Sequence, residues 1–180
     1  MEKYRVKIRG IRPLLMNRFP VEEYLKEDSK PNKVGKPVDP MEEAKKALYV
    51  NSKGEICTPA THILGAMIRA ASDYRIPGKG KKTFKDAVKS GVIIEPEMIP
   101  HKNQKWELDI RPVVVNRARI PRARPRFDEW ELEFTVTVLD ERITPAILKE
   151  ILTSAGRYRG IGDFRPQFGL FEVVEFEKIS

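Results

Sequence analysis

Hydrophobic and polar residues alternate in several short runs of the chain, which is the pattern of a strand with one buried face. The first run covers Lys3 to Arg9, with apolar side chains at positions 4, 6 and 8 and cations at the positions between them. Two more runs cover residues 106–111 and 130–138, and shorter strands are expected at 92–95 and at about 170–177. We expect the runs at 106–111 and 130–138 to pair as the two strands of one hairpin.

Two longer segments carry apolar residues at helical spacing. The first, over residues 58–71, begins with Thr58 and Pro59, a hydroxyl cap followed by proline at the first helical position. The second begins with another Thr-Pro pair at Thr144, and Gly156 is expected to end it. Shorter elements are a helix at 41–48, a hairpin turn at 51–54 and a helix ending near Lys89.

The order of these elements, without the insertions between them, is strand, helix, strand, strand, helix, strand. This order is typical of the ferredoxin-like fold (βαββαβ), an α+β fold in which helices cover one face of an antiparallel sheet. We expect one domain over residues 1–180, with insertions at about 17–57 and 75–104 and a basic hairpin arm at about 116–127. Within the first insertion, residues 17–40 show no clear hydrophobic period.

The composition narrows the class of partner. The chain of 180 residues has a formal net charge of +8 and a pI of about 9.6, which favours nucleic acid or an anionic membrane surface. One cysteine, Cys57, excludes an intrachain disulfide, and two histidines leave little for a zinc site, so we expect no metal and no cofactor. No apolar run is long enough to cross a bilayer, and the start lacks the apolar segment of a signal peptide. We expect a cytoplasmic protein without a membrane partner.

The positive charge is distributed unevenly. The first strand should lie centrally in the sheet, so we expect its outward cations to pair with glutamates on neighbouring strands. The alternative is a nucleic-acid platform on this face, which the lack of outward aromatic residues on the first and third strands disfavours. The segment from Asn116 to Phe127 has five arginines and no acidic residue before Asp128. It could be a solubilising loop, or its arginines could pair with acids elsewhere in the fold. Because prolines stiffen it and guanidinium groups suit phosphate oxygens, we predict an arm that follows phosphates. The contacts would be Arg117, Arg119, Arg122, Arg124 and Arg126.

Two further stretches combine positive charge with glycine. The segment from Gly78 to Lys85 does not match a Walker A loop, so it is a flexible basic loop or a second phosphate contact, through Lys79, Lys81 and Lys82. The segment 156–174 contains Gly160 and Gly162, whose main chain could approach a bound strand closely. Its candidate cations are Arg157, Arg159 and Arg165, whereas its aromatic residues could belong to the core.

The ferredoxin-like order and the phrases CTPATHILGAMIRAA and GIGDFRPQFGLFEV together resemble the RAMP superfamily of CRISPR-associated proteins. In that family a glycine-rich loop precedes the last strand, and here the loop would contain Gly160, Gly162, Gly169 and Phe171. The phrase G-A-x-x-R in the helix matches Gly65, Ala66 and Arg69. In the family's backbone subunits an inserted hairpin reaches along guide RNA, and the segment 116–127 is similar to a small version of it. A compact phage or mobile-element relative would fit the short chain as well.

The resemblance implies noncatalytic binding of single-stranded nucleic acid, RNA in preference to DNA, through the backbone. The partners would be copies of the chain or other subunits of a ribonucleoprotein complex in antiviral defence. The alternative that the resemblance implies is a metal-independent endoribonuclease. His62 is its candidate general base, on a helix face with Ala66, Arg69 and Asp73 and away from the apolar stripe. A third hypothesis is a structural subunit whose arginine arm docks on an acidic protein.

Overall fold

The computed structural model describes residues 1–26 and 39–180. Residues 27–38 belong to the segment 17–40 that we expected as an insertion, and that part of the expectation lies outside the described residues. None of the helices in 1–26 and 39–180 is long and apolar enough to cross a membrane.

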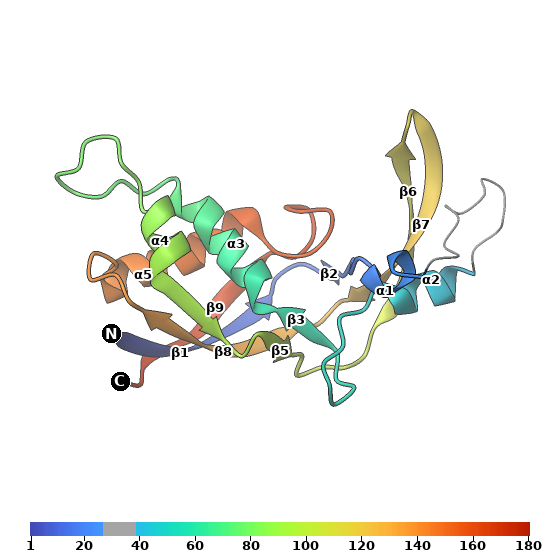
Figure 1. Cartoon of the computed structure of the whole chain (residues 1–180), viewed down its shortest axis with the longest axis horizontal. Coiled ribbons are helices and arrows are strands. Elements are labelled where there is room, and N and C mark those ends of the chain that lie inside the picture. Colours follow the sequence, from blue (N-terminus) through green and yellow to red (C-terminus); the bar gives the residue numbers. More distant parts are fainter. Residues whose placement is uncertain (27–38) are drawn as a thin grey trace.

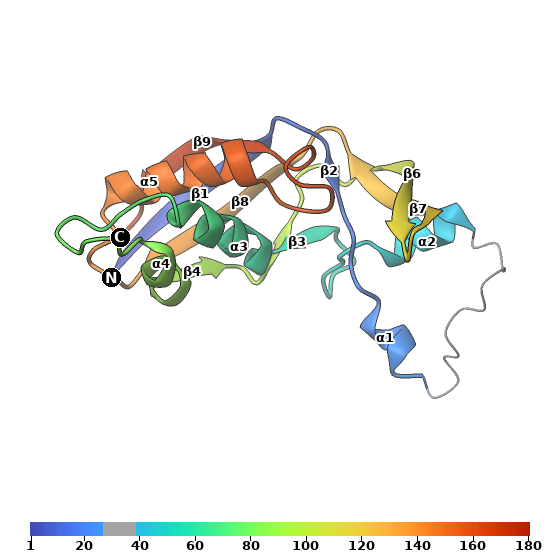
Figure 2. The ribbon, with the colours of Figure 1, turned by 90° about the horizontal axis from the view of Figure 1, so that it is seen from above.

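The centre of the fold is a four-stranded antiparallel sheet with strand order β4-β8-β1-β9. Its strands are β1 (Glu2–Gly10), β4 (Val92–Glu95), β8 (Glu131–Val138) and β9 (Phe171–Lys178). The helices α3 (Ala60–Ala71), α4 (Lys85–Gly91) and α5 (Pro145–Ser154) lie on one face of this sheet (Figures 1 and 2). The predicted α+β, ferredoxin-like fold is confirmed, with β1 in a central position.

Periodicity explains how this core forms. The inward residues of β1, such as Val6 and Ile8, are fully buried against α3 and α5, whose stripes include Ile63, Met67 and Leu148. The Thr144 cap is confirmed, because its hydroxyl oxygen accepts a hydrogen bond from the Ile147 main-chain N–H at 3.3 Å.

The predicted Thr58 cap is wrong. Thr58 lies in a short strand, β3 (Cys57–Pro59), which pairs with β5 (Met98–Pro100), and Pro59 occupies the cap position without a side-chain hydrogen bond. The Thr58 hydroxyl instead shares a hydrogen bond of 2.7 Å with Nε2 of the buried His101. A buried imidazole needs a partner, and this requirement decides the orientation of the hydroxyl.

The expectation that Gly156 ends the second helix is also wrong. The chain continues in one π-helical turn, η1 (Ala155–Arg159), and leaves it at Gly160, which has a φ of +68°. A β-carbon at position 156 would lie 2.2 Å from the carbonyl oxygen of Phe171. Glycine at this position therefore allows the helix to approach β9.

The outer face of the sheet carries the expected lattice of ion pairs. Lys7 lies 3.7 Å from Glu175, and Arg9 lies 3.3 Å from Glu131 and 3.9 Å from Glu172. Arg5 pairs with Glu177 in the same register. These groups are largely exposed, so each pair contributes little stability, but together they neutralise the face.

A second sheet is built on a long hairpin, β6 (Glu107–Val115) and β7 (Ala118–Phe127), with β2 (Leu14–Leu15) at its base. Our pairing of residues 106–111 with 130–138 is therefore wrong, because the arginine segment is itself a strand and β8 pairs with β1 and β4. Asn116 and Arg117, with φ of 49° and 67°, form the tip, as a two-residue hairpin turn requires.

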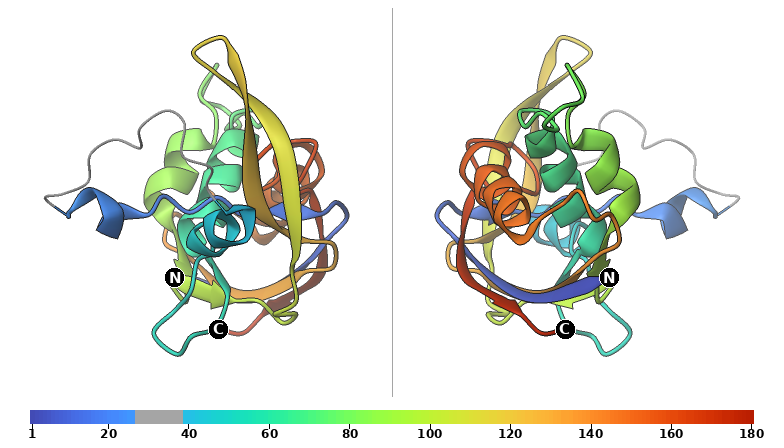
Figure 3. Two further views of the ribbon diagram at one scale, coloured as in Figure 1. Left: turned by 90° about the vertical axis from the view of Figure 1, so that its right-hand side faces the viewer. Right: turned by 90° about the vertical axis from the view of Figure 1, so that its left-hand side faces the viewer.

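Prolines are compatible with this strand because of their register. Pro112 faces Pro121, and Pro125 faces Leu108 at the same parity. Hydrogen-bonded and non-hydrogen-bonded pairs alternate along antiparallel strands, so the missing N–H groups fall on pairs that exchange no backbone hydrogen bonds. The hairpin projects beyond the sheet on the side of the helices (Figures 1 and 3).

Two short helices complete the described part of the chain. They are α1 (Val21–Tyr24) and α2 (Pro40–Lys46), and α2 packs against β7. An isolated bridge between Val50 and Ile56 closes the expected turn at 51–54. The strand β4 lies inside the segment 75–104, so part of that predicted insertion belongs to the central sheet.

Candidate nucleic-acid interface

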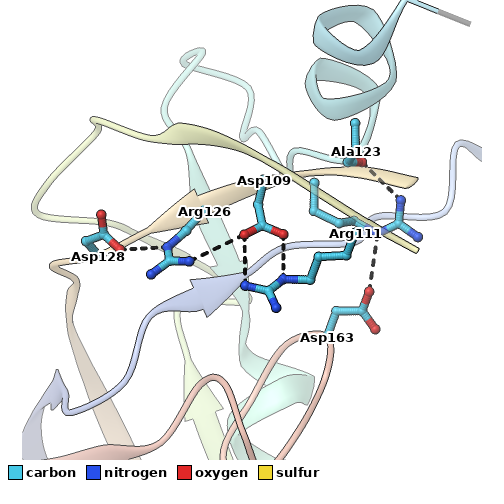
Figure 4. A network of polar contacts seen from close by, with 7 residues as sticks. Asp109, Arg111, Ala123, Arg126, Asp128 and Asp163 are labelled. Atoms are coloured by element: carbon cyan, nitrogen blue, oxygen red, sulfur yellow. Dashed lines mark hydrogen bonds and ion pairs between the residues drawn. The ribbon is translucent and has the colours of Figure 1, made fainter. Parts of the chain in front are cut away.

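Ion pairs fasten the base of the hairpin to its surroundings, and Figure 4 shows those of Asp109, Asp128 and Asp163. Arg124 donates from Nε to Asp163 of the glycine-rich loop at 3.2 Å and from Nη1 to the Ala123 carbonyl at 3.0 Å. Glu43 of α2 lies 3.5 Å from Arg124 and 3.8 Å from Arg122. The side chain of Arg124 is only 14% exposed, so its partners hold it in place.

Asp109 of β6 organises the other side of the base. It is 9% exposed and accepts hydrogen bonds from Arg111 at 2.7 and 3.1 Å and from Arg126 at 3.4 Å. Arg126 also donates to Asp128 at 2.7 Å, and this bond raises the pKa of its guanidinium. The guanidinium groups of Arg111 and Arg126 lie 4.5 and 5.7 Å from the ring centre of Phe168, a residue of the glycine-rich loop.

The five arginines of the predicted arm therefore separate into two groups. Arg122, Arg124 and Arg126 pair with acids from elsewhere in the fold, which was one of the alternatives open from the sequence. Arg117 and Arg119, at the exposed tip, make no ion pair within residues 1–26 and 39–180. Of these five arginines, only the two at the tip have no acidic partner among the described residues.

The glycine-rich loop packs tightly against its own chain. Gly160, Gly162 and Gly169 have positive φ. A β-carbon at Gly169 would lie 1.7 Å from the Ile161 carbonyl oxygen, and one at Gly162 would lie 2.5 Å from that of Leu15. The Gly169 N–H donates to the carbonyl of Pro13 at 2.8 Å. The glycines thus fix the loop against the segment that leads into β2, and their approach to a bound strand stays a prediction.

Cations gather where this loop meets α3 and η1. Arg69 of α3 donates to the Gly160 carbonyl at 3.4 Å, and its pKa is lowered by partial burial and by the positive charges of Arg165 and Arg159. Arg159 pairs with Asp73 at 2.6 Å. Arg157 and Arg165 are exposed and have no ion pair among the described residues. The arrangement concentrates like charges and favours an anion between them.

Two exposed aromatic side chains are neighbours of these arginines along the chain. Tyr158 of η1 is 63% exposed and Phe164 of the glycine-rich loop is 39% exposed, so the alternative that they belong to the core is wrong. The sequence contained no signal for this exposure, because η1 is an irregular turn and the loop has no period. Aromatic side chains between cations suit the bases of a single strand.

His62 is half-buried at the start of α3. Its ring meets that of Tyr49 edge to face at 5.3 Å, and its pKa is lowered by burial and by the charges of Arg165 and Arg69. The expected helix face is less polar than we predicted, because Ala66 is fully buried under the neighbouring segments. His62 lines a pocket of about 170 Å³ together with residues of the β2 segment and the glycine-rich loop.

The remaining candidates lie elsewhere. Lys79, Lys81 and Lys82 are exposed on the loop between α3 and α4, at the end of α3 that is far from the hairpin (Figure 1). His101, which the sequence left without a partner, is 3% exposed and bonded to Thr58, and burial lowers its pKa to about 4.

Comparisons with known proteins show a shared fold. No family model matches the chain, and no curated protein matches it. Among solved structures, the chain is similar to one in the cryo-EM structure of the Type III-B Cmr-β complex bound to cognate target RNA. The TM-score is 0.54 at 16% sequence identity. The match covers 99% of this chain and 61% of the other, so the protein spans about three fifths of the length of its neighbour.

This likeness concerns the arrangement of the elements. It extends over nearly all of the chain, so the central sheet, the helices and the hairpin all fall within the match. The identity is too low to transfer the role of any single residue. The assignment of function therefore depends on the geometry of the cations, the aromatic side chains and the pocket.

Proposed function

We propose that the protein binds single-stranded nucleic acid, RNA in preference to DNA, as a noncatalytic RAMP-like subunit of a CRISPR-type ribonucleoprotein complex or of a related coat. The strand lies on the helix side of the molecule, along α3, η1 and the glycine-rich loop, with the hairpin tip at one end. Its other partners are further copies of the chain or other subunits of the complex.

One observation carries this proposal. Arg5, Lys7 and Arg9 of the outer sheet face are paired with glutamates. On the helix side, Arg69 and Arg165 are close enough for their charges to interact, and they and the exposed Arg157 have no ion pair in the described residues. Tyr158 and Phe164 add exposed rings among them. A basic track with interspersed aromatic side chains is the usual surface for single-strand binding. The fold shared with a chain of an RNA-bound complex supports the choice of RNA.

The cationic and the aromatic side chains would make different contacts with the bound strand. Arg157 and Arg165 would bind phosphate oxygens through their planar forks, and Tyr158 and Phe164 would stack on bases. Arg117 and Arg119 would contact phosphates at the hairpin tip. The loop between α3 and α4, with Lys79, Lys81 and Lys82, would add contacts at the far end of α3. Backbone contacts carry no sequence information, so affinity should depend little on sequence outside the pocket.

The proposal can be tested by fluorescence anisotropy with a labelled unstructured RNA and the matching DNA across a salt series. With Arg69, Arg117, Arg119, Arg157 and Arg165 each on a phosphate, log K should fall with log salt at a slope of about −3.5, from about 0.7 per contact. The Arg157→Ala, Arg165→Ala double variant should flatten that slope to about −2, whereas Arg5→Ala on the sheet face should leave it unchanged. No binding at low salt would reject the proposal and leave an acidic protein as the partner to test.

A second candidate function is metal-independent RNA cleavage with His62 as general base. The observation in its favour is that His62 opens into a pocket beside Arg165, with a lowered pKa that keeps the imidazole neutral near pH 7. Incubation of the RNA with the protein in EDTA, followed by a denaturing gel, tests it. Cleavage that His62→Gln abolishes would replace the noncatalytic proposal, and intact RNA would exclude this candidate for the RNA tested.

A further inference from the structure

The pocket beside His62 is distinct from the basic track, the proposed binding surface along α3, η1 and the glycine-rich loop. One wall consists of apolar side chains of the β2 segment, Leu14, Leu15 and Met16. The rings of His62 and Tyr49 also line the pocket. The glycine-rich loop contributes Gly162, Asp163 and Arg165 to the lining. The lining thus mixes apolar side chains, aromatic rings and polar groups, which suits a flat ligand with polar edges.

The volume restricts the size of that ligand. The pocket measures about 170 Å³. A cavity of about 150 Å³ in another protein accommodates benzene, so a single six-membered ring is the scale that fits here. A purine, with two fused rings, exceeds this scale, whereas a pyrimidine matches it.

The charges restrict its chemistry. Asp163 places a carboxylate in the pocket wall, and His62, whose pKa is lowered by burial and by the charges of Arg165 and Arg69, presents a neutral ring, so neither group offers a positive charge to a phosphate. Arg165 belongs both to this lining and to the cation cluster on the track. A strand whose phosphates contact Arg165 therefore brings its bases to the pocket. Asn17, also in the lining, supplies an amide that can hydrogen-bond a base edge.

We infer that the pocket lined by His62, Tyr49 and Asn17 receives one pyrimidine base, turned out of the bound strand. The inference rests on the proposed function, because the track must first hold the backbone. It gives an otherwise sequence-independent binder a preference at one position of each site. Stacking of one base contributes about 1–3 kcal/mol, which corresponds to roughly 5- to 150-fold in affinity.

The test uses RNA dodecamers that differ at one central position: all adenosine, one uridine, one cytidine and one abasic residue. Their phosphates are identical, so contacts to the track cancel in the comparison. A pyrimidine should raise the affinity at least fivefold over adenosine. The abasic residue relieves purine stacking in the free strand without filling the pocket, so it should bind more weakly than uridine or cytidine.

Variants locate the effect. His62→Ala and, separately, the exposed Asn17→Ala should remove the pyrimidine preference while all-adenosine RNA still binds, and Arg5→Ala should retain it. Circular dichroism of each variant checks the fold, and a gel in EDTA checks that the RNA is intact. Equal affinities for all four dodecamers would overturn the pocket inference and leave the proposed function standing. Failure of all four to bind at low salt would overturn both.

Discussion

The strand β1 and the second half of β7 look alike in sequence, since cations occupy alternate positions of both, but their ion pairs differ in the structure. On β1, Arg5, Lys7 and Arg9 pair with glutamates directly across on β8 and β9. On β7, the acids come from α2, β6, the loop after β7 and the glycine-rich loop. Pairs within one sheet neutralise a face, whereas pairs between separate segments fix how those segments are arranged.

The two ends of β7 also differ in their surroundings. Its base is enclosed by acids and rests on Phe168, whereas its tip carries Arg117 and Arg119 in solvent. The tip can therefore contact a polyanion, and the base determines where the tip is held. Four changes test this division, from the largest expected effect to the smallest.

The largest effect should come from acid, which should destabilise the protein at the base of β7. Phe127, its last residue, lies against buried His101, with ring centres 4.8 Å apart. Burial lowers the pKa of His101 to about 4, below the ordinary 6.5, so between these values only the unfolded chain binds the proton. Stability should therefore fall as pH drops from about 6.5 to about 4, by about 3 kcal/mol in all. Urea unfolding at pH 7, 6 and 5 measures it.

The control for the acid effect is His101→Gln, which cannot titrate in this range. The free energy of unfolding of this variant should depend less on pH between pH 7 and pH 5, where carboxylates with ordinary pKa values remain ionised in the folded and unfolded states. A variant with the same pH dependence as the parent protein would show that another group is responsible.

Loss of Asp109 should come next. Asp109→Ala leaves Arg111 and Arg126 side by side, with no carboxylate between them, and should lower the free energy of unfolding by about 2 kcal/mol. Hydrogen exchange should also accelerate in residues 107–127 and much less in β1. Unchanged exchange in the hairpin would contradict the role of the base as its anchor.

At the hairpin tip, the effect should concern binding and not stability. The Arg117→Ala, Arg119→Ala double variant should bind RNA roughly tenfold more weakly at low salt, and its salt slope should be shallower by about 1.4, from about 0.7 per contact. Its urea midpoint should match that of the parent protein. The matched control is Arg5→Ala, Arg9→Ala on β1, and equal losses in both pairs would refute the division between the two strands.

The smallest effect should come from the sheet lattice. Glu177→Gln removes the exposed partner of Arg5 and should change the free energy of unfolding by less than about 0.5 kcal/mol. A loss as large as that of Asp109→Ala would mean that the lattice on β1 also acts as an anchor.

Sequence patterns predicted the part of the fold that depends on local period. The alternation in β1 and β8 and the helical stripes fix the central sheet, its order and the pairing of outward charges. The hairpin was misread because β7 alternates arginine with alanine, proline and isoleucine, so it lacks a continuous apolar face, and proline argues against a strand. The register of β7 follows from its pairing with β6.

The site was predictable in its cations and not in its partners. Arg69, Arg157 and Arg165 were candidates because of their type and neighbours. The pairing of Arg124 with Glu43 and Asp163 depends on segments distant in the chain, for which a single sequence holds no signal. The pocket is a similar case, because Tyr49 and Asn17 lie in a stretch that had been assigned to an insertion.

Asp163 has two functions at once, as the partner of Arg124 in β7 and as part of the wall of the pocket beside His62. A ligand that pulls the hairpin tip away from the body would strain this ion pair and shift the pocket wall with it. The anchor of the hairpin and the proposed nucleobase pocket therefore share one residue. A movement of the hairpin base would therefore change the pocket wall through a single carboxylate.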